Sequence, residues 1–180
     1  MRTSRYFQLA VGAALLGAPV AFAQIVALDL RGMLERADSA IVGSIVEKSV
    51  WSGPLGGPDT IVEFTTIKVQ GEDLVRGGEV THSITFLGSE TRPCSEMPTA
   101  NETKVGTKGV FFSKKLQETW GGRADQWSMI AAQGGIFRIE SGPKGDVVIG
   151  KGQGFAVSEN RLMTELRADV SRELTAIRRK

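Results

Sequence analysis

The chain holds few side chains able to do acid–base or nucleophilic chemistry. Cys94 is the only cysteine and His82 the only histidine among 180 residues. A thiol and an imidazole within hydrogen-bond reach form a nucleophile–base pair. Pro93 and Pro98 flank Cys94, however, and the pattern predicts neither a nucleophile elbow nor a helix N-terminus that would activate the thiol. A hydrolase that uses Cys94 and His82 is therefore kept as an alternative hypothesis.

His82 lies in a predicted strand, Glu79–Leu87, that alternates cleanly between apolar and polar residues. Val80, His82 and Ile84 share one face of this strand. One histidine and one thiol do not complete a zinc site without further ligands. The pattern therefore favours a histidine in the core or at the rim of a barrel, and it predicts no metal site and no cofactor.

Cys94 lies in a long polar loop, Gly88–Thr103. The loop acids Glu90, Glu96 and Glu102 match no EF-hand spacing, so we expect them to be solvated. Because the chain has no second cysteine, we expect an unpaired loop thiol or an intermolecular disulfide. The disulfide would make the chain a structural envelope protein dimerised through Cys94, which is a second alternative.

The N-terminal segment has the form of a secretory signal peptide. Arg2 and Arg5 precede an apolar run, Leu9–Leu16, and Ala21-Phe22-Ala23 gives an A-x-A cleavage pattern. We therefore predict that residues 1–23 are removed and that residues 24–180 are exported to a periplasm or out of the cell. No later apolar run reaches the roughly 20 residues of a membrane span, so no span is expected after cleavage.

The charge balance argues against a nucleic-acid partner. The chain has 22 Lys and Arg against 20 Asp and Glu, and the predicted signal peptide removes Arg2 and Arg5 without removing an acid. The remaining chain is formally neutral, whereas nucleic-acid binding normally needs a basic surplus on one face. The basic end at Arg178, Arg179 and Lys180 is expected to be a solvated helix terminus.

The first half of the exported part reads as a short helix followed by long strands. Gly43 interrupts an Ile- and Val-rich strand and suggests a bend or a close approach of backbones. In the next strand Val62 and Phe64 differ in parity from Ile67 and Val69, which predicts a β-bulge there. The predicted elements are a helix at Ala27–Asp38 and strands at Ser39–Trp51, Asp59–Gln70 and Glu79–Leu87.

The second half contains shorter strands and closes with an amphipathic helix. Strands are predicted at Lys108–Lys114, Trp127–Ala132 and Gly135–Glu140, the last forming a hairpin with Val147–Ile149. The helix is predicted over residues 158–178 with Ser158 as its N-cap. Its apolar stripe is expected to dock on the sheet, and it consists of Leu162, Leu166, Val170, Leu174 and Ile177.

This order of elements predicts a mainly β protein. A single domain over residues 24–180 is expected, with a small antiparallel OB-like β-barrel between a short N-terminal helix and the C-terminal helix. No internal repeat interrupts it.

Several segments resemble the netrin-like, TIMP-like OB-fold domains of exported bacterial proteins. They are "ADSAIVGSIVE" at Ala37–Glu47, "VEFTTIKV" at Val62–Val69, "GEDLVRGGEVTHSITFLG" at Gly71–Gly88, and "KVGTKGVFFSK" at Lys104–Lys114 after a cysteine loop. The resemblance implies a binding or inhibitory module rather than an enzyme. The inhibitory wedge of tissue inhibitors of metalloproteinases needs an N-terminal cysteine and a disulfide. Gln24 stands at the predicted mature N-terminus, so that wedge has no counterpart here.

The sequence thus favours an exported, non-catalytic binding module with a protein partner, for which an exported protease is one candidate. OB-like barrels bind through the face of strands two and three and the adjoining loops. The candidate binding residues are Trp51, Phe64, His82, Cys94, Trp120 and Trp127. For each of the four aromatic residues, which could bind a partner if exposed, packing in the core is the favoured interpretation. The oligomeric state is left open by the sequence.

Overall fold

A computed structural model describes residues 27–94 and 97–179 of the chain. The signal peptide predicted for residues 1–23 lies outside these residues. The elements are α1 (Leu30–Arg36), β1 (Ser39–Pro54), β2 (Ile61–Asp73), β3 (Glu79–Leu87), β4 (Lys108–Lys115), β5 (Trp127–Met129), η1 (Ala132–Gly135), β6 (Ile136–Gly142), β7 (Gly145–Val148), β8 (Arg161–Leu162) and α2 (Met163–Arg178).

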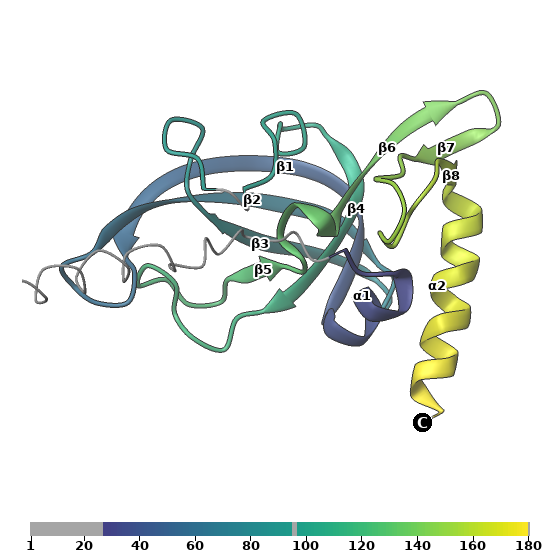
Figure 1. Cartoon of the computed structure of the whole chain (residues 1–180), viewed down its shortest axis with the longest axis horizontal. Coiled ribbons are helices and arrows are strands. Elements are labelled where there is room, and N and C mark those ends of the chain that lie inside the picture. Colours follow the sequence, from purple (N-terminus) through teal and green to yellow (C-terminus); the bar gives the residue numbers. More distant parts are fainter. Residues whose placement is uncertain (1–26, 95–96, 180) are drawn as a thin grey trace, which may run out of the picture.

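Five of the strands close into a barrel, which confirms the predicted OB-like architecture (Figure 1). Around the ring the order is β1, β2, β3, β5 and β4, and β4 pairs with β1 to complete it. Every pair in the ring is antiparallel except β3 with β5, which run parallel and meet at Ile84 and Trp127. This one parallel pair is the seam of the barrel.

Glycine allows β1 and β2 to coil tightly around each other. Gly43 faces Gly71 across the pair, and a Cβ atom on Gly43 would overlap the carbonyl oxygen of Gln70. The register shifts between Ile45 and Glu47, so Val46 forms a bulge in β1. The close approach predicted at Gly43 is therefore confirmed.

The bulge predicted within the second strand is wrong, because β2 alternates regularly. Ile67 and Val69 point into the barrel, whereas Phe64 points outward and is buried there by a loop. The residues of the two parities point to the two faces of one regular strand. The barrel interior covers one face, and the loop covers Phe64 on the other. β1 also continues to Pro54, three residues beyond its predicted end, since Ser52, Gly53 and Pro54 pair with β2.

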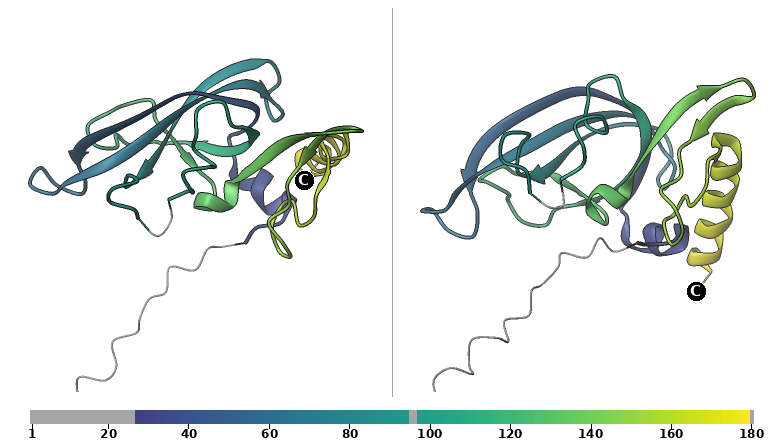
Figure 2. Two further views of the ribbon diagram at one scale, coloured as in Figure 1. Left: turned by 90° about the horizontal axis from the view of Figure 1, so that it is seen from above. Right: turned by 45° about the horizontal axis from the view of Figure 1, so that its top comes forward.

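Two hydrophobic layers hold the fold together. The barrel interior is closed by side chains from all five strands, including Ile41, Ile67, Ile84, Phe111 and Trp127. A second layer lies outside the barrel, between the outward faces of β1, β4 and β6 and the two helices. Figure 2 shows the resulting arrangement from above, with α2 and the β6–β7 hairpin beside the barrel. Both helices are therefore structural parts of one packed unit.

The C-terminal helix packs through its predicted stripe but begins later than predicted. Leu166 and Val170 are buried against the outer layer, and Leu174 and Ile177 are partly buried there. Ser158 is not its N-cap, because residues 158–160 are irregular, Arg161 and Leu162 form β8, and the helix begins only at Met163. The carbonyl of Ser158 accepts a hydrogen bond from the amide of Gly152 (3.0 Å), and β8 pairs with β7. In α1 the N-cap is Asp29, whose carboxylate accepts a hydrogen bond from the amide of Gly32 (2.7 Å).

No helix within residues 27–94 and 97–179 combines the length and the apolar character needed to cross a membrane.

Candidate functional site

An aromatic and cationic stack covers the outer face of β1 and β2 near their hairpin. Trp51 of β1 stacks on Phe64 of β2, with ring centroids 4.6 Å apart and planes 21° apart. The ring centroid of Trp120 lies 6.0 Å from that of Phe64, and the guanidinium carbon of Arg123 lies 4.0 Å from the centre of the Trp51 ring. Arg123 over Trp51 has the geometry of a cation–π contact. We call Trp51, Phe64, Trp120 and Arg123 the aromatic cluster.

A tight turn in the β4–β5 loop, residues 116–126, delivers two members of the cluster. Trp120 and Arg123 exchange both backbone hydrogen bonds, at 2.9 and 3.2 Å, across Gly121 and Gly122. Both glycines have positive φ, 56° and 82°, as a primed two-residue turn requires. A Cβ atom on Gly121 would clash with the ring of Trp51. The Trp-Gly-Gly-Arg sequence thus fixes the loop against the barrel.

A chain of polar side chains extends from the aromatic cluster across the same face. The indole nitrogen of Trp51 donates to the hydroxyl of Thr66 (2.9 Å), which lies 2.8 Å from the hydroxyl of Thr85 in β3. Thr85 in turn bonds to the amide oxygen of Gln126. These residues fix the ring of Trp51 and tie the β4–β5 loop to β2 and β3. These contacts order the side chains on this face of the protein.

Two of the four aromatic candidates, Phe64 and Trp127, are buried, in agreement with the favoured interpretation of core packing. Phe64 is fully covered by Trp51 and the β4–β5 loop, and Trp127 points into the barrel, where it is 7% exposed. Trp51 and Trp120 are half-buried. The sequence missed Arg123, which is exposed, although the two glycines that place it are visible there. The surface that a partner can reach is formed by Trp51, Trp120 and Arg123.

His82 lies inside the other end of the barrel, on the apolar side that its strand predicts. It is 7% exposed and stacks on Trp127 with centroids 3.6 Å apart. Arg76 lies over the same indole, 5.3 Å from its centre. Burial lowers the pKa of His82 below 6.5; the charge of Asp73 opposes this shift, and those of Arg76 and Lys115 add to it. His82 is therefore a core residue whose surroundings favour the neutral imidazole.

Cys94 and His82 do not form a pair. A Cβ atom on Gly88, just beyond β3, would lie 3.2 Å from the Cβ of Cys94, which places Cys94 at that end of the strand. His82 lies earlier in β3, and at about 3.3 Å per residue the strand separates it from Gly88 by roughly 20 Å. Cys94 is half-buried and lines a mostly apolar cavity of about 250 Å³ with Phe86, Leu87, Trp120 and Met129 among its other walls. The nucleophile–base arrangement is therefore not assembled.

The expectation that the loop acids are solvated is wrong for Glu102. Its carboxylate lies 2.6 Å from the ammonium of Lys151 and accepts from the amide and the hydroxyl of Thr99 (3.0 and 2.9 Å). Burial raises the pKa of Glu102, but the hydrogen bond and charge of Lys151 outweigh it, and the pKa is lowered overall. Glu90 is exposed and pairs with Lys48 at 2.5 Å. Glu96 lies outside the described residues.

Within the described part of the chain, no three His, Cys, Asp or Glu side chains group as metal ligands would. Comparison with known proteins adds no relative: no protein family, no curated protein and no solved structure matches the chain. The aromatic cluster is the candidate binding site of the described residues.

Proposed function

We propose that the chain is an exported, non-catalytic binding module that recognises a protein partner through the aromatic cluster. The observation that carries this proposal is the position of the cluster. It lies on β1 and β2 beside the β1–β2 hairpin and is completed by the β4–β5 loop. In OB-like barrels these two loops flank the binding face of strands two and three, and the contact of Thr66 with Thr85 extends from the cluster onto that face. An exported protease is one partner of this kind.

The chemistry of the cluster favours a protein over a nucleic acid. Tryptophan and arginine are enriched among the residues that carry most of the binding energy at protein interfaces. The acids and bases near the cluster neutralise one another: Lys68 pairs with Glu47 at 2.5 Å, and Arg92 lies 3.7 Å from Glu63. A strand of phosphates would instead need a surplus of unpaired cations.

Rigidity of the face supports the same proposal. Both backbone bonds of the Trp120–Arg123 turn and the bond from the Trp51 indole to Thr66 hold these side chains in place. A surface ordered in advance loses less conformational entropy when a partner binds. Phe64, which is fully buried, supports the cluster from beneath and does not itself reach the surface.

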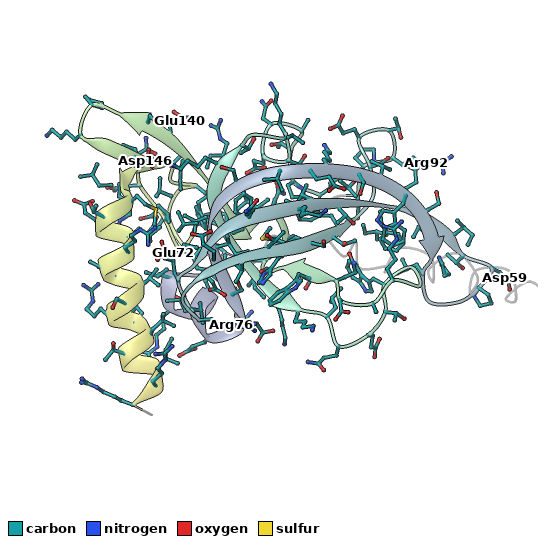
Figure 3. The ribbon with its side chains drawn as sticks, turned by 180° about the vertical axis from the view of Figure 1, so that it is seen from behind. Asp59, Glu72, Arg76, Arg92, Glu140 and Asp146 are labelled. Atoms are coloured by element: carbon teal, nitrogen blue, oxygen red, sulfur yellow. The ribbon has the colours of Figure 1, made fainter. Side chains whose placement is uncertain are left out.

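The experiment is a comparative capture from the envelope and culture fluid of the host. The full chain with a C-terminal tag is used beside a Trp120→Ala/Arg123→Ala variant and a Glu140→Ala/Lys144→Ala control in the distant β6–β7 hairpin (Figure 3). A protein that binds the parent chain and the control but not the cluster variant, and that binds again when purified, supports the proposal. If no captured protein depends on the cluster, the proposal fails. Repeating the capture with Cys94→Ser separates disulfide partners from the rest.

A further inference from the structure

The outer edge of β1 is unpaired along the second half of the strand. From Ser39 to Ser44 β1 pairs with β4, and Ile45 then bonds to Gly106 and Thr107 (2.8 and 3.0 Å). Beyond the bulge, residues 47–54 pair with β2 on one side only; on the other side they have no backbone partner within residues 27–94 and 97–179. Figure 3 shows this part of β1 arching over the barrel toward the hairpin tip that Asp59 marks. The open edge is roughly 25 Å long at the usual strand rise.

Exposed apolar side chains follow this same edge. Within the described residues the large hydrophobic side chains that are exposed are Val46, Val50, Ile61 and Val105, at 45%, 53%, 60% and 52%. Val46 is the bulge where the edge begins, and Val50 lies in its middle. Val105 adjoins Gly106, which bonds to Ile45, and Ile61 pairs with Pro54 at the far end. The exposed large hydrophobic side chains of the described residues therefore gather along the half of β1 whose outer edge is unpaired.

The usual protection of an open edge is weak between Val46 and Pro54. Natural sheets block their edges with bulges, prolines and projecting lysines. The bulge and the proline stand at the two ends of this edge, and the one lysine within it is engaged elsewhere. Lys48 contacts the carboxylate of Glu90 at 2.5 Å and the hydroxyl of Thr103 at 3.0 Å. Lys48 is thus held against the loop of Glu90 and Thr103 and does not project from the edge to block it.

We propose that an extended segment of the protein partner adds to the edge of β1 at Glu47–Pro54 as a further strand. An edge offers backbone donors and acceptors in a row, and another extended backbone matches them directly. Val50 and Trp51 point to opposite faces of β1. A strand paired with this edge would place one side chain beside each of them, so we expect the partner segment to carry two adjacent apolar residues near its centre. Pro54, which lacks an N–H group, sets the end of the pairing. This inference rests on the proposed function and names how the partner binds.

A second copy of the chain is the less favoured occupant. A foreign segment can contact the edge and also the aromatic cluster, because Trp51 belongs to both. The added contact with Trp51, Trp120 and Arg123 is what would make its binding specific.

The test uses the full chain and a display library of short linear peptides, with amide hydrogen exchange as the readout. Selected peptides are expected to protect those amides of residues 47–53 that point to the unpaired side of β1. Val50→Lys should weaken their binding by about tenfold or more, because it sets an ammonium against an apolar contact. Gln70→Lys is the control, since Gln70 is also exposed but its strand is paired on both sides. N-methylation of alternate peptide amides should abolish binding in one register and spare it in the other.

Three results would overturn the inference. Peptides that protect only the β4–β5 loop would place binding on the aromatic cluster alone and leave the proposed function standing. A library without any binder would exclude strand addition. The proposed function would then still be tested separately by the comparative capture. Protection of residues 47–54 that rises with protein concentration, without peptide, would assign the edge to a second copy.

Discussion

The guanidinium of Arg123 lies over the indole of Trp51, 4.0 Å from the ring centre, and the same indole stacks on Phe64 at 4.6 Å. The relationship joins a loop that follows β4 to the strands at the start of the chain. Within the cluster Phe64 is a buried support, whereas Arg123 is exposed and can contact a partner.

Truncation within the cluster should separate stability from binding. Phe64→Ala removes a fully buried ring, so we expect the free energy of unfolding to fall by about 4 kcal/mol. Arg123→Ala removes an exposed cation–π contact and should cost less than about 1 kcal/mol, while partner binding falls clearly. Urea titrations of both variants give the comparison. Equal losses of stability would show that Arg123 is a structural residue.

The close approach of β1 and β2 predicts an unusual sensitivity at Gly43. A methyl group there would overlap the carbonyl oxygen of Gln70, so Gly43→Ala should destabilise the barrel by about 3 kcal/mol or more. Gly57→Ala is the matched control, because a Cβ atom at Gly57 has nothing within 4 Å and should change stability by less than about 0.5 kcal/mol. If the two variants melt alike, the tight coil at Gly43 is contradicted.

His82 should make the stability of the protein depend on pH in the mildly acidic range. Its pKa is lowered in the folded state, chiefly by burial, so the unfolded chain binds a proton at this site more readily. The stabilisation is complete above the ordinary value of 6.5 and is lost as the pH falls from there through the lower native pKa. The urea midpoint of the parent chain should therefore drop over this range.

His82→Leu isolates that contribution, because it keeps an apolar side chain against Trp127 and removes the titrating group. The carboxylates still titrate in the variant, so only the slope nearest pH 6.5 should disappear. An unchanged slope in the variant would mean that His82 titrates alike in the folded and unfolded chain.

Cys94 should be dispensable for folding. Its thiol is half-buried at an apolar cavity and has no partner cysteine in the chain, so Cys94→Ser should shift stability by less than about 1 kcal/mol. The parent chain should migrate as a monomer on a non-reducing gel. A dimer band that vanishes with Cys94→Ser would instead support the structural protein dimerised through this thiol.

Sequence patterns predicted the elements of this fold better than their closure. The limits of β3 and the stripe of α2 follow from local periodicity, and Gly43 stands out inside a strand of branched residues. The closing pair of β3 with β5 joins Ile84 to Trp127, and no local pattern encodes a contact between such distant residues. The start of α2 was missed because Ser158 bonds to the Gly-rich segment instead of capping the helix.

The candidate site was predicted in part for a related reason. A tryptophan or phenylalanine on a strand is exposed or buried according to what covers its face. Phe64 is covered by a distant loop, and Trp127 faces the barrel interior, so their burial is a property of the tertiary structure. The signal for Arg123 was local: two glycines between a tryptophan and an arginine indicate a tight turn that sets the two side chains together.

The most direct test of the binding role is photo-cross-linking from position 124 in the full chain, in its host. A photoreactive residue in place of Ala124, which is exposed next to Arg123, is compared with one in place of Glu140, which is exposed on β6 away from the cluster (Figure 3). The proposed function predicts one discrete protein adduct from position 124 that the Trp120→Ala variant loses, and no such adduct from position 140. Identical adduct patterns from both positions, or none from position 124, would contradict it.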